Sequence, residues 1–220
     1  MIQLLPFALA LTVAAAAPAP AIAPGTYTYV ASASGAPVGT TIVTVTSSGG
    51  NTVIAEKGSG SAQGQSGSAN GTLTLGADLS PTTYQLDGTM GAQALKDSAT
   101  ISGSTATVTG LQGTKSFNLL GSTKHFVVID LGVISGFVAL PAQMASWNND
   151  PVLAVIPSFG TSLAIAPDAS LTPARPANVP STDAPLAFGG RVPFTIWYNP
   201  TNFIADEIDV PAQNLTVIRK

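Results

Sequence analysis

The sequence contains no cysteine and only one histidine. Without cysteine there is no disulfide, no thiolate metal site, no cysteine nucleophile and no lipid-modified cysteine of a bacterial lipoprotein. A single histidine also excludes the usual ligand sets of zinc and copper sites. We therefore predict a chain without metal or cofactor, whose folded state depends on its own hydrophobic core.

Charged residues are also scarce, at 9% of the 220 residues, against about 25% in ordinary soluble domains. The eight Lys and Arg residues are scattered along the chain, and the net charge is −3. Surfaces that follow a phosphate backbone need clustered basic side chains, so nucleic acid is excluded as a partner. With 45% hydrophobic residues, the composition favours either a membrane protein or an exported protein whose surface is built from Ser, Thr and Gly.

The N-terminus holds the one candidate membrane segment, residues 4–17, which at about 14 residues is shorter than the roughly 20 that a spanning helix needs. Alternating Ala and Pro residues follow, and small residues stand where a signal peptidase would cut. We predict a signal peptide over residues 1–21, and a cut after Ala16 also fits. An uncleaved N-terminal anchor is the alternative, because no Lys or Arg precedes the apolar segment 4–17. The protein is then exported, periplasmic or extracellular, most simply bacterial, with no stable membrane span after cleavage.

From residue 25 onward the sequence mostly alternates with a period of two. Segments such as GTYTYVASA (25–33) and VGTTIVTVTS (38–47) are rich in Thr, Val, Ile and Tyr, with glycine-containing turns between them. Such segments recur about every ten residues up to residue 120, which predicts antiparallel strands joined by hairpins. The Gly- and Ser-rich stretch 58–72 predicts a flexible loop, part of which could form a weak strand. Segments 151–158 and 161–168 predict a further strand pair.

Two later segments depart from this alternation. Residues 131–147 carry apolar side chains near helical spacing on nearly all sides, which predicts a short helix buried against the sheet or lying in its mouth. Pro141 is expected to break or kink this helix, or to begin a second one. Residues 167–190 hold five prolines with little periodicity and predict a surface loop. Because the remaining 30 residues are too few for a second domain, residues 22–220 are predicted to form a single β-rich domain.

Three short segments carry a family resemblance: GAPVGTTIVTV (35–45), DLSPTTYQL (78–86) and IWYNPTNFIADEIDVPAQNLTVIRK (196–220). They resemble the opening hairpin, a tyrosine-bearing strand and the terminal hairpins of a family of exported bacterial β-proteins of unassigned function, related to the lipoprotein-carrier half-barrel clamp. The resemblance implies a mainly β fold, a strongly curved antiparallel sheet (half-barrel/clamp) with the helical segment over its concave side and an apolar groove between them. It supplies no catalytic residues, and the stretches 58–72 and 167–190 fit it least well.

The common catalytic motifs are missing from the sequence. No serine stands in a G-x-S-x-G elbow, and there is no S-x-x-K motif. His125 is expected to begin a strand as a partly exposed polar residue. The acidic residues Asp206, Glu207 and Asp209 are interpreted as a solvated strand face, because alternation divides them between two faces and a Ca²⁺ site needs a curved loop. We predict a non-enzymatic protein, with a hydrolase whose site is invisible in the sequence as the alternative.

The aromatic side chains, 6% of the chain, are the remaining candidates for a site. In VPFTIWYN (192–199), alternation separates Trp197 from the face that carries the neighbouring Phe and Tyr. Such faces either fill the core or line a groove, and burial alone, at about 2–3 kcal/mol for each ring, would explain them. The leading hypothesis is a module that binds an apolar ligand, a lipid or acyl chain, in the concavity of the sheet; the alternative is a structural or interaction domain of the cell envelope with a packed interior. The predicted ligand-binding residues are Tyr27, Tyr29, Phe137, Met144, Phe194 and Tyr198.

Overall fold

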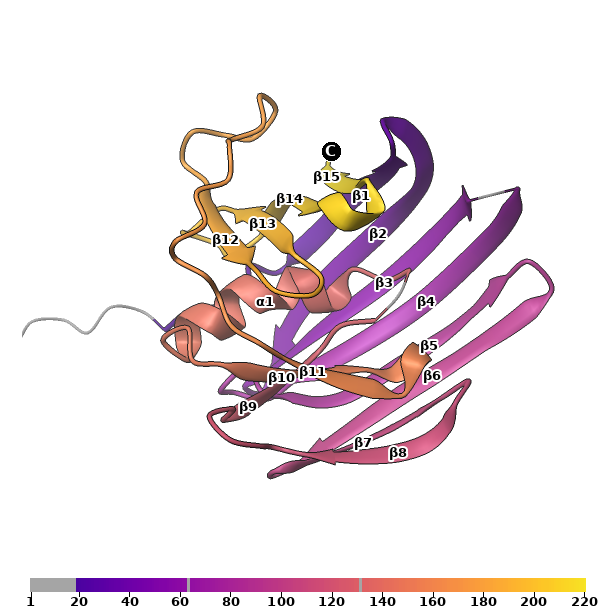
Figure 1. Cartoon of the computed structure of the whole chain (residues 1–220), viewed down its shortest axis with the longest axis vertical. Helices are drawn as coiled ribbons and strands as arrows, with labels where there is room; N and C mark the ends of the chain where they lie inside the picture. Colours follow the sequence, from indigo (N-terminus) through magenta and orange to yellow (C-terminus); the bar gives the residue numbers. More distant parts are fainter. Residues whose placement is uncertain (1–18, 63, 131) are drawn as a thin grey trace, which may run out of the picture.

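The computed structural model describes residues 19–62, 64–130 and 132–220, and about half of them lie in the strands of one strongly curved antiparallel sheet (Figure 1). This sheet has 12 strands in the order β12-β13-β14-β15-β1-β2-β3-β4-β5-β6-β7-β8. A second sheet, β11-β10-β9, and the helix α1 lie on its concave side. The predicted mainly β fold, with an open curved sheet and a helix over its concave side, is confirmed.

The strands of the large sheet follow the hairpin order expected from the sequence. Its consecutive N-terminal strands are β1 (Gly25–Ala33), β2 (Ala36–Ser48), β3 (Asn51–Ala62), β4 (Gln65–Leu75), β5 (Pro81–Met90), β6 (Gln93–Ser102), β7 (Thr105–Gly110) and β8 (Gly113–Asn118). The C-terminal strands are β12 (Ala184–Phe188), β13 (Phe194–Tyr198), β14 (Ala205–Val210) and β15 (Leu215–Arg219). The small sheet and the remaining elements are β9 (His125–Val128), α1 (Ser135–Ser146), β10 (Val152–Ile156), β11 (Thr161–Ile165) and the 3-10 turns η1 (Pro157–Phe159) and η2 (Pro211–Gln213).

Alternation along each strand separates an apolar concave face from a hydroxyl-rich convex face. On β4, for example, Leu73 and Leu75 are buried, while Thr72 is exposed and Thr74 is only half-buried. On the convex face, hydroxyl groups of neighbouring strands lie within hydrogen-bond distance, as in the pair Thr109 and Thr114 at 2.9 Å. Such cross-strand pairs stabilise a sheet without ionic groups. The low charge of the chain is therefore matched by a surface of Thr and Ser.

The stretch 58–72 is not a flexible loop, so that prediction is wrong, whereas the alternative that part of it forms a strand is confirmed. β3 and β4 pair continuously from Thr52↔Leu75 to Ala62↔Gln65, so nearly the whole stretch lies in a long hairpin. The ladder is made by backbone groups, which glycine and serine supply as well as any residue does. Glycine is needed here because the backbones approach closely: a Cβ on Gly60 would lie 2.5 Å from the Val38 carbonyl oxygen.

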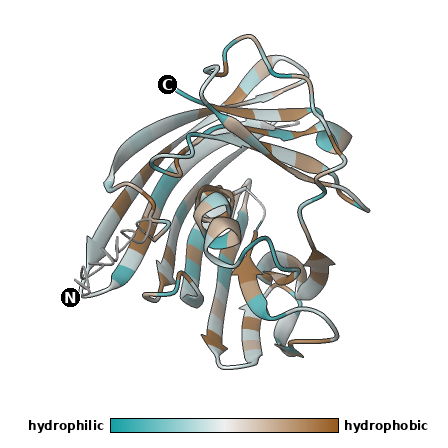
Figure 2. Ribbon diagram, turned by 90° about the vertical axis from the view of Figure 1, so that its left-hand side faces the viewer, coloured by the Kyte–Doolittle hydropathy of each residue, from teal (hydrophilic) through white to brown (hydrophobic). Residues whose placement is uncertain are grey.

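The helix α1 begins and ends within the predicted segment 131–147 and packs against strands of both sheets (Figure 2). Its start has no capping side chain of its own. Instead, Oε2 of Glu56 on β3 accepts hydrogen bonds from the N–H groups of Ile134 and Ser135, each at 2.8 Å. The expected break at Pro141 is wrong, because the helix continues through this residue. Packing on nearly all sides keeps the helical turn in place where the proline removes one hydrogen bond.

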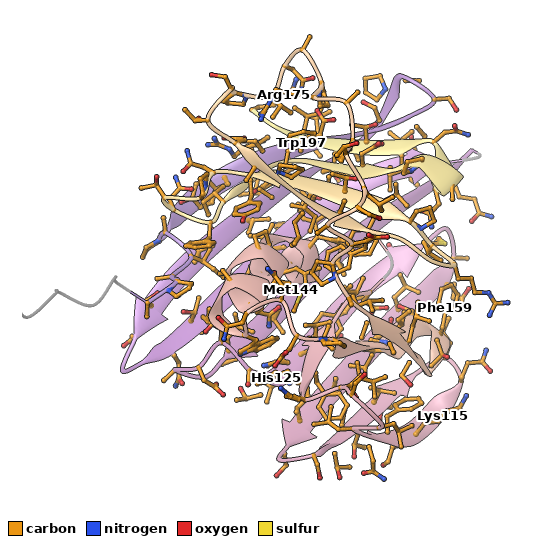
Figure 3. All side chains as sticks on the ribbon, turned by 60° about the vertical axis from the view of Figure 1, so that its left-hand side comes forward. Lys115, His125, Met144, Phe159, Arg175 and Trp197 are labelled. Carbon is orange, nitrogen blue, oxygen red and sulfur yellow. The ribbon has the colours of Figure 1, made fainter. Side chains whose placement is uncertain are left out.

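The proline-rich segment 167–190 is only partly a surface loop, because residues 184–188 form the edge strand β12 and pair with β13. The preceding residues fold against β13 and β14, where the Arg175 guanidinium lies 4.6 Å from the centre of the Trp197 ring (Figure 3). This packing corrects the interpretation of the acidic residues of β14 as solvated. Asp206 and Glu207 are buried, the first paired with Arg219 and the second accepting a hydrogen bond from Asn178.

The predicted signal peptide lies almost wholly outside the described residues, which begin at residue 19. Just after the predicted cleavage point, the Ile22 side chain is buried in the core, and the N–H of Ala23 donates to the Asn202 carbonyl at 2.9 Å. Among residues 19–62, 64–130 and 132–220, no helix has the length and apolar character needed to cross a membrane.

Candidate functional site

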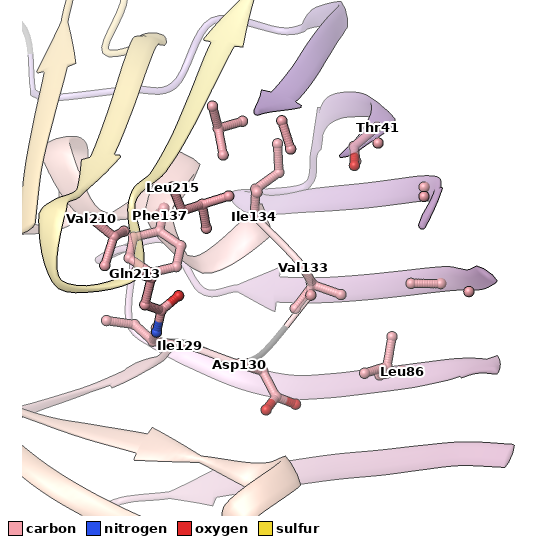
Figure 4. A pocket seen from close by; sticks show the side chains of 18 of the residues that line it. Thr41, Leu86, Ile129, Asp130, Val133, Ile134, Phe137, Val210, Gln213 and Leu215 are labelled. Atoms are coloured by element: carbon pink, nitrogen blue, oxygen red, sulfur yellow. The ribbon is translucent and has the colours of Figure 1, made fainter. Parts of the chain in front are cut away.

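A cavity of about 570 Å³ lies between the concave face of the large sheet, α1 and the small sheet (Figure 4). Strands β1 to β6 form one side of it, β10 and β11 the second, and β13 to β15 the third. Its large lining side chains are almost all apolar. They include Leu86, Ile134, Phe137, Phe194, Leu215 and Val217.

The cavity exists because the inward-facing side chains become smaller along β3 and β4. Towards one end of these strands the inward positions carry Ile54 and Leu73, both fully buried in the core. Towards the other end they carry Gly58, Gly60 and Ala69, which line the cavity. Glycine and alanine leave the space that larger side chains fill elsewhere. The core is thus packed at one end of the sheet and hollow at the other.

Three apolar lining side chains, those of Met90, Phe159 and Val192, reach the solvent, and we call these three residues the mouth of the cavity. All three side chains line the cavity, yet their exposed fractions are 51%, 52% and 42%, respectively. They come from the end of β5, from η1 and from the residues just before β13. Exposed apolar side chains around an apolar cavity are typical of a binding site, because a folded chain otherwise buries such groups.

One acidic side chain, Asp130, lies on the cavity wall (Figure 4). Its Oδ2 accepts a hydrogen bond from the Tyr84 hydroxyl, and its Oδ1 accepts one from the N–H of Ser158, both at 3.0 Å. The Ser158 hydroxyl in turn donates to Oδ2 of buried Asp97 at 2.7 Å. Burial and the neighbouring carboxyls raise the pKa of Tyr84. The Tyr84 hydroxyl therefore stays protonated and holds Asp130 in place as a donor.

Glu56 is buried close to this wall, under the first turn of α1. Burial raises the pKa of its carboxyl from 4.5 to about 7, although the two N–H donors of the helix act in the opposite direction. Proximity to Asp130 raises this pKa further. Its Oε2 caps the helix, while its Oε1 has no hydrogen-bond partner among the described residues. The helix start is thus attached to the sheet through a group that titrates near neutral pH.

Of the six residues predicted to bind a ligand, Phe137 and Phe194 lie together on the cavity lining. Their rings meet edge to face with centroids 5.4 Å apart, and Phe188 stacks on the far side of Phe194 at 4.5 Å. Phe137 comes from α1 and Phe194 from the start of β13. The pair therefore connects the helix to the C-terminal strands at the cavity.

The other four predicted residues lie outside the described lining of the cavity. Tyr29 is fully buried and donates its hydroxyl to the Ala205 carbonyl at 3.0 Å. Tyr27 donates in the same way to the carbonyl of residue 23, and Met144 is buried in the core (Figure 3). Tyr198 is partly buried and stacks on a neighbouring phenylalanine. These four side chains make structural contacts within the protein.

The single histidine begins β9 and is partly exposed, as predicted. The His125 ring stacks on Trp147, with centroids 4.2 Å apart and planes at 2°. Burial lowers the pKa of His125, which favours the neutral ring in this stack. No group of three or more His, Asp or Glu side chains in the described part of the chain is arranged to hold a metal ion.

The fold and cavity define a mainly β protein with a partly open apolar cavity beneath one helix. No protein-family model matches the chain, and no curated protein matches its sequence. Among solved structures, the chain is similar to a DUF1089 family protein from Pseudomonas aeruginosa, with 8% sequence identity and a TM-score of 0.45. The likeness covers 79% of this chain and 90% of that chain. At this level it carries no argument about function, and the relation to the lipoprotein-carrier half-barrel stays a prediction.

Proposed function

We propose that the chain is an exported, non-enzymatic protein that binds an apolar ligand, a lipid or acyl chain, in the cavity under α1. The observation that carries this proposal is the cavity itself. Its volume of about 570 Å³ falls within the roughly 300–1,000 Å³ of small-molecule sites, and its lining is mostly apolar. The proposal that the protein is exported rests on the N-terminal sequence, with its short apolar run and small-residue cleavage site.

The alternative of a structural domain with a packed interior is supported less well. A packed interior would leave no space of this size beside Gly58, Gly60 and Ala69, which line the cavity. The exposed apolar side chains of the mouth also favour a binding protein over a purely structural one. For the hydrolase alternative, the stacking of His125 on Trp147 favours a packing role for this side chain.

Native mass spectrometry of the protein purified without detergent tests the proposal. We expect a population that carries a bound apolar molecule, which organic extraction releases. In Ala69→Trp, the large side chain lies inside the cavity and should abolish this bound mass. Ala55→Trp is the matched control, because Ala55 belongs to the neighbouring strand and lies outside the lining. Equal loading of the two variants, or an empty wild-type protein that takes up no long-chain probe, would contradict the proposal.

A further inference from the structure

The lining of the cavity is uneven in charge. Among the described residues that line it, Asp130 is the one acidic or basic side chain, and no Lys, Arg or His is present. Both oxygens of Asp130 accept hydrogen bonds from protein donors, Oδ2 from the Tyr84 hydroxyl and Oδ1 from the Ser158 N–H. A ligand in this cavity therefore meets mostly apolar side chains and some neutral polar ones, such as Gln65 and Gln213, while Asp130 is the one ionisable side chain of the described lining.

The surroundings of Asp130 strengthen this negative character. The ionisable groups that act on the neighbouring Tyr84 hydroxyl are Asp130, Glu56 and Asp97, all of them carboxyls. Glu56 and Asp97 are 4% and 2% exposed, so solvent screens them poorly. A carboxylate or phosphate placed at this wall would meet carboxyl groups and no Lys, Arg or His among the described lining residues, whereas a hydroxyl or ammonium group would meet an acceptor.

We infer that the ligand is a long-chain molecule with a hydroxyl or amine group that donates to Asp130, and that the cavity rejects anionic amphiphiles such as fatty acid carboxylates. This inference rests on the proposed function and names the chemical class of its ligand. The chain of the ligand lies along the apolar lining, from Asp130 past the Phe137 and Phe194 rings, and the mouth admits it.

Four probes with the same chain length test the inference: 1-decanol, decylamine, decanoate and methyl decanoate. Each is titrated at pH 8 against the protein loaded with the neutral fluorophore N-phenyl-1-naphthylamine. We expect decanol and decylamine to displace the fluorophore at concentrations about tenfold lower than decanoate does, because decanoate would bring a like charge into a desolvated site. Methyl decanoate has no charge and no donor, and it should also bind more weakly than decanol.

Asp130→Asn locates the origin of this discrimination. In this variant, the affinity for decanoate relative to that for decanol should be at least about threefold higher than in the wild type, because the amide removes the like charge. Asp87→Asn is the matched control, because it removes the same charge from an exposed residue on β5 that lies outside the cavity lining. This control variant should rank the four probes as the wild type does.

Decanoate binding as tightly as decanol, or methyl decanoate doing so, would overturn the inference while leaving the cavity as a ligand site. A ranking unchanged in Asp130→Asn would overturn it as well. If the fluorophore and all four probes fail to bind the wild-type protein, the proposed function itself is wrong. The wild-type ranking decides the question even if the Asp130 variant does not fold.

Discussion

The Glu56 carboxyl makes the attachment of α1 to the sheet sensitive to pH. Burial raises its pKa from 4.5 to about 7 in the folded protein, so the folded state binds this proton more tightly than the unfolded chain does. The stabilisation is fully present below pH 4.5 and is lost as the pH rises to about 7. At about 1.4 kcal/mol for each pH unit, this difference corresponds to about 3 kcal/mol of unfolding free energy. Glu56→Gln abolishes the titration and keeps an oxygen that can accept from the helix N–H groups.

Urea unfolding followed by tryptophan fluorescence measures this effect at pH values from 4 to 8. We expect the unfolding free energy of Glu56→Gln, relative to the wild type, to rise by about 3 kcal/mol over this range. Asp183, with a pKa raised to about 6, titrates in the same range but is present in both proteins, so its contribution cancels. Parallel pH curves for the two proteins would refute the reasoning, because they would show that Glu56 does not titrate differently on folding.

Three further substitutions test individual contacts of the fold by the same unfolding assay. Tyr84→Phe removes the hydroxyl that donates to Asp130 and should cost about 1–3 kcal/mol; no loss would show that this hydrogen bond is not formed. Gly136→Ala places a Cβ 1.9 Å from the Val128 carbonyl oxygen and should cost about 1–3 kcal/mol, and unchanged stability would contradict this close packing. Arg175→Ala removes the guanidinium over an indole ring and should cost about 1 kcal/mol and shift the emission of the folded protein; an unaltered spectrum would count against the contact.

The period of two predicted most of the sheet, because strand faces depend on local alternation. β1, β2 and the closing strands lie where Tyr, Thr, Val and Ile alternate. The far part of the hairpin of β3 and β4 was predicted mainly as a loop because glycine and serine are also the residues of flexible loops. Contacts between distant residues were equally out of reach: Glu56 caps a helix that begins almost 80 residues later along the chain.

The candidate site was predicted only in part. Phe137 and Phe194 stood out as large apolar side chains, and both line the cavity. The cavity itself results from side chains that are absent, at Gly58 and Gly60 on the inward face of β3. Glycine at alternate positions, directly after a strand with large apolar residues, was the signal in the sequence that could have indicated a hollow. Asp130 gave no signal, because its place on the wall depends on three separate elements.

The hydroxyl-rich convex face has a consequence for the conditions under which the fold persists. The ion pairs found in the described part of the chain are Lys124–Asp150 and Arg219–Asp206, and the first is largely exposed to solvent. Added salt weakens exposed ionic contacts, but it has little effect on hydrogen bonds between hydroxyl groups or on apolar burial. We therefore expect the fold to tolerate wide changes in ionic strength.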